Sequence, residues 1–140
     1  RQEKTPTHWY GLKFFNVYGP TEINKGPMAS VVLKAYLQIQ QTGQLKLFKS
    51  ENPDYKDGEQ KRDFVYVKDL TRWMLELTKR RPKSDIYNMG FGKARTWNDL
   101  AKCVFSSMGK SLNIEYIPLP ENLRQQYQYF TEADVRKWLS

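Results

Sequence analysis

An apolar run that ends abruptly constrains the fold of this chain more than any other feature. The run spans Leu12–Val17, carries Asn16 near its end, and is soon stopped by the pair Gly19-Pro20. Such a run is typical of a buried strand that delivers its carboxyl end to a loop, which is where open α/β sheets bind ligands. Lys25 stands in the following loop, just before a helical pattern. The sequence therefore predicts a ligand site where this strand ends.

Strand patterns and helix patterns alternate along the rest of the chain. We expect strands at 45–48, 62–67, 85–89 and 113–117, helices at 28–41, 69–79 and 97–108, and a short helix opened by a capping box at 131–134. The order βαβ, a long exposed loop at 49–61, then βαβαβα favours an α/β architecture. A complete doubly wound sheet cannot be built from these strands, so we expect the chain to expose a strand edge.

Apolar residues recur at helical spacing in the three longer helix patterns and predict the core. The expected core positions are 32, 35, 36 and 39, then 70, 73, 74 and 77, and then 97, 100, 101, 104, 105 and 108. Gly43 is expected to end the first helix, Asp69 to cap the second and Thr96–Asp99 to form a capping box for the third. Cys103, the single cysteine, excludes an intrachain disulfide and a cysteine-rich metal site, and its apolar surroundings predict burial. We predict no metal site.

Composition bounds the classes of function. A chain of 140 residues, 39% hydrophobic, can bury one core of ordinary size. The net charge is +8, and residues 1–50 hold seven Lys or Arg against two Asp or Glu. This basic part can be a solvated surface, face a diphosphate or bind nucleic acid, but no nucleic-acid motif supports the last. No apolar run approaches the roughly 20 residues that span a bilayer, so we expect neither a nucleic-acid nor a membrane partner.

Several short motifs follow one another from about Leu12 to the end of the chain. They are Phe14–Pro20, Lys25–Ser30, Lys46–Phe48, Lys61–Val67, Tyr87–Gly92 and Glu115–Pro118. On these motifs the chain resembles the extended short-chain dehydrogenase/reductases that act as sugar-nucleotide epimerases and dehydratases, in particular their ADP-heptose 6-epimerase branch. The resemblance implies the C-terminal part of such an enzyme. Its glycine-rich start and catalytic Tyr-x-x-x-Lys would lie upstream of Arg1, and its last helix beyond Ser140.

The resemblance implies a fold and an activity. The fold would be the C-terminal part of a doubly wound parallel-sheet dinucleotide-binding domain (residues 1–27 and 63–82) with a small α/β substrate lobe (residues 28–62 and 83–140). The parent would be an NADP-dependent epimerase of an ADP-sugar, a homo-oligomer that serves lipopolysaccharide precursor synthesis in a bacterial cytoplasm. Without the missing N-terminal half of that enzyme, the chain is expected to be inactive.

Lys25 is the catalytic residue that the resemblance implies, as a second acid/base close to the cofactor. The backbone of Val17 would meet the nicotinamide end of NADP, and Asn16 would contact the substrate sugar. Pro27 and Lys34 would flank the sugar, and both depart from the family, which usually has a small residue and often a histidine there. By residue type alone, Lys25 is a surface lysine and Asn16 a turn former.

The resemblance also sets Arg62 against the substrate diphosphate, which suits the bidentate fork of a guanidinium. A salt bridge with Asp63 or Asp69 is the alternative. The contacts on the adenine side of the substrate would be Phe48, Lys49, Ser50 and Glu51. The phenylalanine can equally fill the core. Tyr127 would be a further substrate contact, with Tyr129 as the less favoured choice.

Two other interpretations stand beside this one. The parent can be another nucleotide-sugar epimerase or a 4,6-dehydratase. The chain can also be a non-catalytic module whose basic face binds a nucleotide or nucleic acid. The codons upstream of Arg1 discriminate between them, because a Tyr-x-x-x-Lys there indicates the enzyme and a start codon with nothing before it favours the module.

Overall fold

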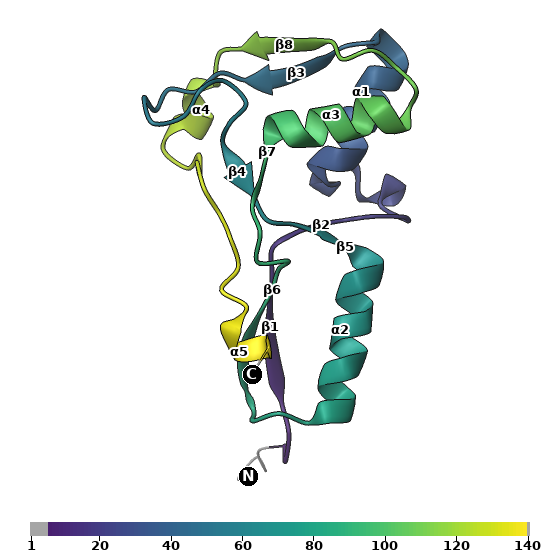
Figure 1. Cartoon of the computed structure of the whole chain (residues 1–140), viewed down its shortest axis with the longest axis vertical. Helices are drawn as coiled ribbons and strands as arrows, with labels where there is room; N and C mark the ends of the chain where they lie inside the picture. Colours follow the sequence, from purple (N-terminus) through teal and green to yellow (C-terminus); the bar gives the residue numbers. More distant parts are fainter. Residues whose placement is uncertain (1–5, 140) are drawn as a thin grey trace.

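Strands and helices alternate along the chain in the computed structural model, which describes residues 6–139 (Figure 1). The elements are β1 (Tyr10–Phe14), β2 (Asn16–Tyr18), the 3-10 helix η1 (Ile23–Met28), α1 (Val31–Thr42), β3 (Leu45–Phe48), β4 (Lys61–Arg62), β5 (Phe64–Tyr66), α2 (Val67–Arg80), β6 (Asp85–Met89), β7 (Arg95–Thr96), α3 (Trp97–Ser107), β8 (Ile114–Ile117), α4 (Glu121–Arg124) and α5 (Arg136–Leu139). The strands predicted at 45–48 and 85–89 are confirmed to the residue.

Parallel pairing dominates the strands of the described chain. β1 pairs with β6, β2 with β5 and β3 with β8, all in parallel, while β4 and β7 form a short antiparallel pair. At least one helix lies between the members of each parallel pair, as such a crossover requires. This pairing confirms the predicted α/β class. The prediction missed η1, β7 and α4, which at six, two and four residues are too short to show a period.

The strand predicted at 12–17 is two strands that pair with different neighbours. The Phe15 N–H donates to the Met89 carbonyl at 3.2 Å beside β6, and the Asn16 N–H donates to the Asp63 carbonyl at 3.0 Å beside β5. The prediction that this strand is buried is wrong, because the Phe14 side chain is 50% exposed. Among the described residues β1 pairs on one side only, which leaves it with the free edge that the sequence led us to expect.

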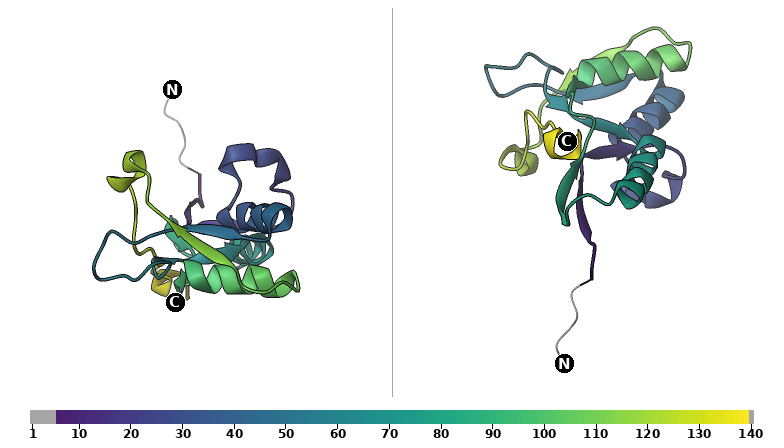
Figure 2. Two further views of the ribbon diagram at one scale, coloured as in Figure 1. Left: turned by 90° about the horizontal axis from the view of Figure 1, so that it is seen from above. Right: turned by 60° about the horizontal axis from the view of Figure 1, so that its bottom comes forward.

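Two apolar clusters hold the elements together. In the upper part of Figure 1, α1 and α3 pack on β3 and β8 around the fully buried Ile39. In the lower part, α2 packs on β1, β5 and β6 around Leu77. Figure 2 shows α3 running alongside the β3–β8 pair in both views. The predicted helix faces supply most of the upper cluster but only Leu70, Trp73 and Leu77 of the lower one, where strand residues dominate. Tyr36, Met74 and Cys103 are exposed, since each lies on the solvent side of its stripe.

Local signals fix the ends of the longer helices. The Ser30 hydroxyl accepts from the Leu33 N–H at 3.2 Å and caps α1, so this helix begins three residues later than predicted. Gly43 ends α1 with a φ of 71°, a conformation that glycine adopts readily. Thr96 and Asp99 form the predicted capping box of α3. The caps predicted at Gly43 and at Thr96 are therefore confirmed.

Two other predicted caps are wrong. Asp69 lies in the first turn of α2, because this helix begins directly after β5. Residues 131–134 are not helical, and α5 begins beyond them. In that segment the Ala133 N–H donates to the Asp63 carboxylate at 2.9 Å. A long-range hydrogen bond thus replaces the predicted local one.

The polar stretch 49–60 is a loop, as predicted, but it is not exposed throughout. Gly58 and Gln60 are buried. The Asn98 amide of α3 donates to the Asp57 carbonyl at 3.1 Å. The end of the loop is therefore fastened to α3 before the chain enters β4.

Candidate functional site

The carboxyl end of β1 is where the chain changes neighbours, and two hollows open there. At Asn16 the strand leaves β6 and joins β5. The first hollow, of about 290 Å³, lies between β2 and the start of α1, and the second, of about 310 Å³, lies between β1 and the segment after α4. Phe15 and Asn16 line both. Diverging strand ends are a common place for α/β proteins to bind ligands.

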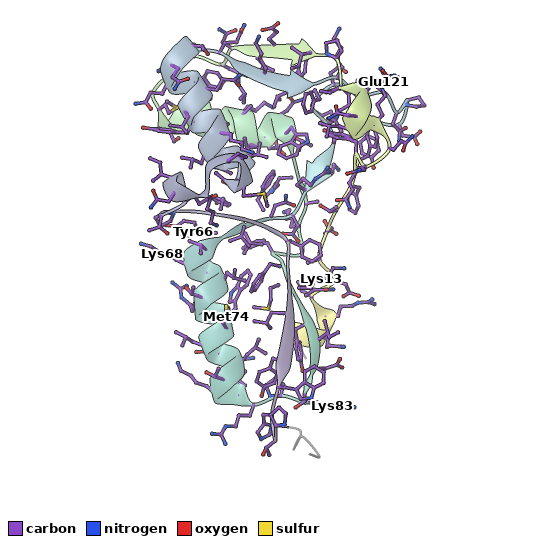
Figure 3. All side chains as sticks on the ribbon, turned by 180° about the vertical axis from the view of Figure 1, so that it is seen from behind. Lys13, Tyr66, Lys68, Met74, Lys83 and Glu121 are labelled. Carbon is purple, nitrogen blue, oxygen red and sulfur yellow. The ribbon has the colours of Figure 1, made fainter. Side chains whose placement is uncertain are left out.

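The second hollow joins β1 to the C-terminal part of the chain. Lys13 lines it together with Gln128 and Thr131. Figure 3 shows Lys13 on β1, with Tyr66 and Lys68 at the start of α2. The Thr131 hydroxyl is buried and has no partner among the residues that the structure describes. A lysine and an unpaired hydroxyl give this region hydrogen-bond donors that suit an oxygen-rich ligand.

Glu22 is a buried residue of this region that the sequence reasoning missed. Its carboxylate accepts from the Gly19 N–H at 2.7 Å, the Ser30 N–H at 2.6 Å and the Ser30 hydroxyl at 3.0 Å. Burial acts to raise the pKa of Glu22, but these hydrogen bonds from Ser30 and Gly19 outweigh it and lower the pKa. Glu22 therefore ties together the two ends of the segment that carries Lys25. Its position as one of two acids in the first 50 residues was the available signal.

Lys25 lies on η1 with an exposed side chain and is not among the described residues that line the two hollows. Pro27 is exposed as well, and its carbonyl accepts from Lys34 Nζ at 2.7 Å. This hydrogen bond joins Pro27, in η1, to Lys34, in α1. Asn16 and Val17 lie on β2 and line the first hollow.

Arg62 is buried between two aromatic rings. Its Cζ atom lies 5.5 Å from the centroid of the Trp97 ring and 5.7 Å from that of Tyr127, and burial lowers the pKa of its guanidinium. Within the described chain Arg62 forms no ion pair. Asp63 accepts backbone N–H groups, and Asp69 lies 3.7 Å from an arginine of its own helix. The alternative of a salt bridge to either aspartate is therefore wrong.

The candidates of the adenine side begin at the end of β3. Phe48 is half-buried and meets the Tyr127 ring edge-on, with centroids 6.3 Å apart. Lys49 is exposed, and the Ser50 N–H donates to the Asp57 carboxylate at 2.8 Å. Burial also raises the pKa of the Tyr127 hydroxyl. The structure therefore brings Phe48, Arg62 and Tyr127 into one aromatic and cationic cluster.

Glu51 and Tyr129 fasten the 49–60 loop to the segment after α4. The Glu51 carboxylate lies 2.9 Å from Arg124, and its N–H donates to the Tyr129 hydroxyl at 3.2 Å. Gln128, next to Tyr129, accepts at its carbonyl from Arg62 Nη2 and lines the second hollow. Gln128 thus connects the Arg62 cluster with the hollow at the strand end. Lys25 remains apart from that cluster, on η1.

Asp63 is a second buried acid, which the sequence suggested only as a salt-bridge partner of Arg62. Its carboxylate accepts from the N–H groups of Phe91, Gly92 and Ala133 at 2.7, 2.9 and 2.9 Å. A Cβ atom at Gly90 would lie 2.2 Å from the Ala133 Cβ, so only glycine fits there. Asp63 thus joins the turn after β6 and the segment before α5 to the place where Asn16 begins to pair with β5. An aspartate inside an apolar strand pattern was the available signal.

Residues 6–139 show neither a metal cluster nor a membrane span. Within that range, no three His, Cys, Asp or Glu side chains are grouped so that they could hold a metal ion. None of the helices described is both long and apolar enough to cross a bilayer.

Comparison with known proteins decides the family. The model of the NAD dependent epimerase/dehydratase family matches residues 2–90, more than half of the chain. The chain belongs to this family. This family agrees with the resemblance that the sequence motifs indicated. A site at the carboxyl ends of parallel strands is the arrangement expected of such an α/β chain.

Two curated proteins similar to this chain are named ADP-L-glycero-D-manno-heptose-6-epimerase. The protein of Nitratidesulfovibrio vulgaris is 55% identical over 126 residues, which cover 90% of this chain and 39% of the relative. The protein of Fusobacterium nucleatum is 47% identical over 143 residues, which cover 98% and 43%. The crystal structure of the Helicobacter pylori enzyme of this name matches with a TM-score of 0.76 and 32% identity, over 94% of this chain and 37% of that one. The chain spans about two fifths of the length of the curated relatives that it matches.

Proposed function

We propose that this chain is the C-terminal, substrate-binding portion of an NADP-dependent nucleotide-sugar epimerase that acts on ADP-glycero-manno-heptose. The observation that carries the proposal is the 55% identity, over nine tenths of the chain, to a relative named for that activity. We further propose that residues 1–27 and 63–82 belong to the dinucleotide-binding domain, and that residues 28–62 and 83–140 form the substrate lobe. The separate apolar clusters around α2 and around α1 and α3 support this division, except that β6, with Tyr87 and Met89, packs in the α2 cluster beside β1.

The first hollow suits one end of a nicotinamide dinucleotide. Val17, Val32 and Phe64 line it with apolar groups, and the backbone of β2 supplies polar ones, a combination that fits the flat ring and amide of nicotinamide. No strand of the described chain passes through a GxGxxG turn into a helix. We therefore assign the contacts to the phosphates of the cofactor to the part of the relatives that this chain does not cover. When bound, the cofactor would accept and return the hydride.

The residues of this chain would bind and orient the sugar nucleotide and move a proton. Asn16 offers both donors and an acceptor to sugar hydroxyls, beside both hollows. Arg62 would face the diphosphate, because it is a buried cation without an acidic partner in the described chain. Lys25 would exchange a proton with the hydroxyl at the reacting carbon. Because its side chain is exposed, this role requires that the bound substrate covers it.

The test is epimer formation, followed by NMR of the sugar with NADP supplied. We expect no turnover by the 140-residue chain alone, and turnover when the N-terminal half of an ADP-heptose epimerase is added, covalently or as a separate fragment. In the complete enzyme, Lys25→Met should depress turnover strongly with a smaller loss of substrate affinity, while the exposed Lys46→Met serves as the matched control. Turnover by the isolated chain would overturn the placement of the cofactor site, and near-normal turnover of Lys25→Met would overturn the role of that lysine.

A further inference from the structure

The Arg62 guanidinium is buried with part of its hydrogen-bonding capacity unused. Its Nη1 donates to the Lys61 carbonyl at 2.8 Å, and its Nη2 donates to the Gln128 carbonyl. A guanidinium has five N–H donors and keeps its charge in proteins, so three donors remain without an acceptor among the described residues. A buried charge without a counter-ion is costly unless further partners complete it. The geometry therefore leaves room for an anionic ligand at Arg62.

Trp97 forms one side of the aromatic cage around Arg62, and both its backbone and its ring have partners. The capping box of α3 begins one residue before it. The Trp97 N–H of the backbone donates to the Gln60 carbonyl at 3.2 Å, and the ring meets Phe64 edge-to-face with centroids 5.4 Å apart. Tyr127, the opposite contact of Arg62, comes instead from the segment after α4. Trp97 is thus an aromatic surface held at the start of α3 by the 49–60 loop and by Phe64 of β5.

We propose that Trp97 is a positioning residue whose indole face holds the Arg62 guanidinium in the orientation that binds the diphosphate of the nucleotide. This inference rests on the proposed function, which sets Arg62 against that diphosphate. Bidentate recognition of phosphate oxygens depends on the plane of the guanidinium, which a stacked ring fixes. A desolvated contact between an arginine and a tryptophan corresponds to a loss of roughly 5- to 30-fold in affinity when it is removed.

A purely structural role makes a different prediction. Trp97 also packs against the upper apolar cluster. If its only role were to fill that cluster, its loss would disturb binding whether or not the ligand carries phosphates. The loss would also be the same whether or not Arg62 is present. Dependence on phosphate and on Arg62 therefore separates the two roles.

The experiment is calorimetric titration of the 140-residue chain with ADP and with adenosine, in a double-mutant cycle. Trp97→Leu should weaken ADP binding by roughly 5- to 30-fold and change adenosine binding by less than about twofold. In an Arg62→Ala background, the same substitution should change ADP affinity by less than about twofold, because the contact is already absent. Trp73→Leu, the same exchange in the lower cluster, is the matched control and should leave ADP affinity unchanged.

Two further variants keep the test decisive. Trp97→Phe retains a ring face and should bind ADP within about threefold of the unsubstituted chain. Trp97→Met replaces the leucine variant in the cycle if circular dichroism shows that the latter is unfolded. Equal losses with and without Arg62, or equal losses for ADP and adenosine, overturn the positioning role alone. Failure of the unsubstituted chain to bind ADP overturns the proposed function, and the role of Trp97 with it.

Discussion

Replacing Asp63 by asparagine should destabilise the chain severely, although the two side chains have nearly the same shape. The Asp63 side chain is fully buried. Its Oδ2 atom accepts two backbone N–H groups, from Gly92 and Ala133, and its Oδ1 atom accepts one, from Phe91. An asparagine has only one oxygen for these positions. Its amide NH₂ must therefore face at least one N–H group, and donor then meets donor.

The magnitude follows from these three bonds. Losing one hydrogen bond to a charged acceptor costs about 1.5–3 kcal/mol, and the two that remain weaken from charged to neutral by roughly 0.8–1 kcal/mol each. The expected loss is about 3–5 kcal/mol. That is a large part of the roughly 5–15 kcal/mol by which a domain is usually stable. The variant should therefore stand close to the limit of folding.

Urea unfolding of the chain, followed by tryptophan fluorescence, measures this loss. At a slope of about 2 kcal/mol per molar urea, the midpoint should fall by about 1.5–2.5 M. Hydrogen exchange at Phe91, Gly92 and Ala133 should accelerate in the variant. Asp54→Asn makes the same exchange at an exposed loop position and should leave the midpoint unchanged. A free energy of unfolding for Asp63→Asn within about 0.5 kcal/mol of the parent chain would refute the reasoning.

Three further predictions concern other features. Because the pKa of Glu22 is lowered in the folded chain, its carboxylate stabilises the chain above the ordinary carboxyl pKa, and this stabilisation is lost as pH falls through the folded-state pKa. In urea unfolding, Glu22→Gln should therefore destabilise the chain at about pH 7 and much less at about pH 3. A pH-independent difference would contradict this. Gly58→Ala should lower the melting temperature more than Gly43→Ala. Both glycines have a positive φ, but a Cβ at Gly58 would lie 2.1 Å from Asn98 Oδ1, whereas nothing lies within 4 Å of a Cβ at Gly43. Equal decreases in melting temperature would count against the clash. Cys103 should react stoichiometrically with a thiol reagent in the folded chain, and protection until urea is added would place it inside.

Elements whose patterns are local could be predicted from the sequence. The strands at 45–48 and 85–89 and the capping box at Thr96 depend on residues that are neighbours in the chain. The break after Phe14 could not be predicted, because it depends on where the distant strand β6 ends and the distant strand β5 begins. The expected cap at 131–134 failed for the same reason, since its amide groups are used by a residue of another segment.

The candidate site shows the same division. Motif resemblance singled out Arg62, Phe48 and Tyr127, and the structure brings these three together. Glu22 was missed and Asp63 was given the wrong partner, because both carboxylates accept mainly from backbone N–H groups, which a sequence pattern does not display. The contact of Trp97 with Arg62 was hidden as well, since the start of α3 and β4 lie far apart in the chain and meet only in the folded structure.

The pairing of strands that lie far apart in the chain has a consequence for how this protein folds. Tyr10 pairs with Asp85, and Leu45 pairs with Ile114, so neither β1 nor β3 can find its partner nearby. A topology of this high contact order folds slowly, because long loops must close before their contacts stabilise them. During synthesis, β3 must stay unpaired until residues 114–117 have left the ribosome. We therefore expect the nascent chain to depend on chaperones until its C-terminal segment emerges.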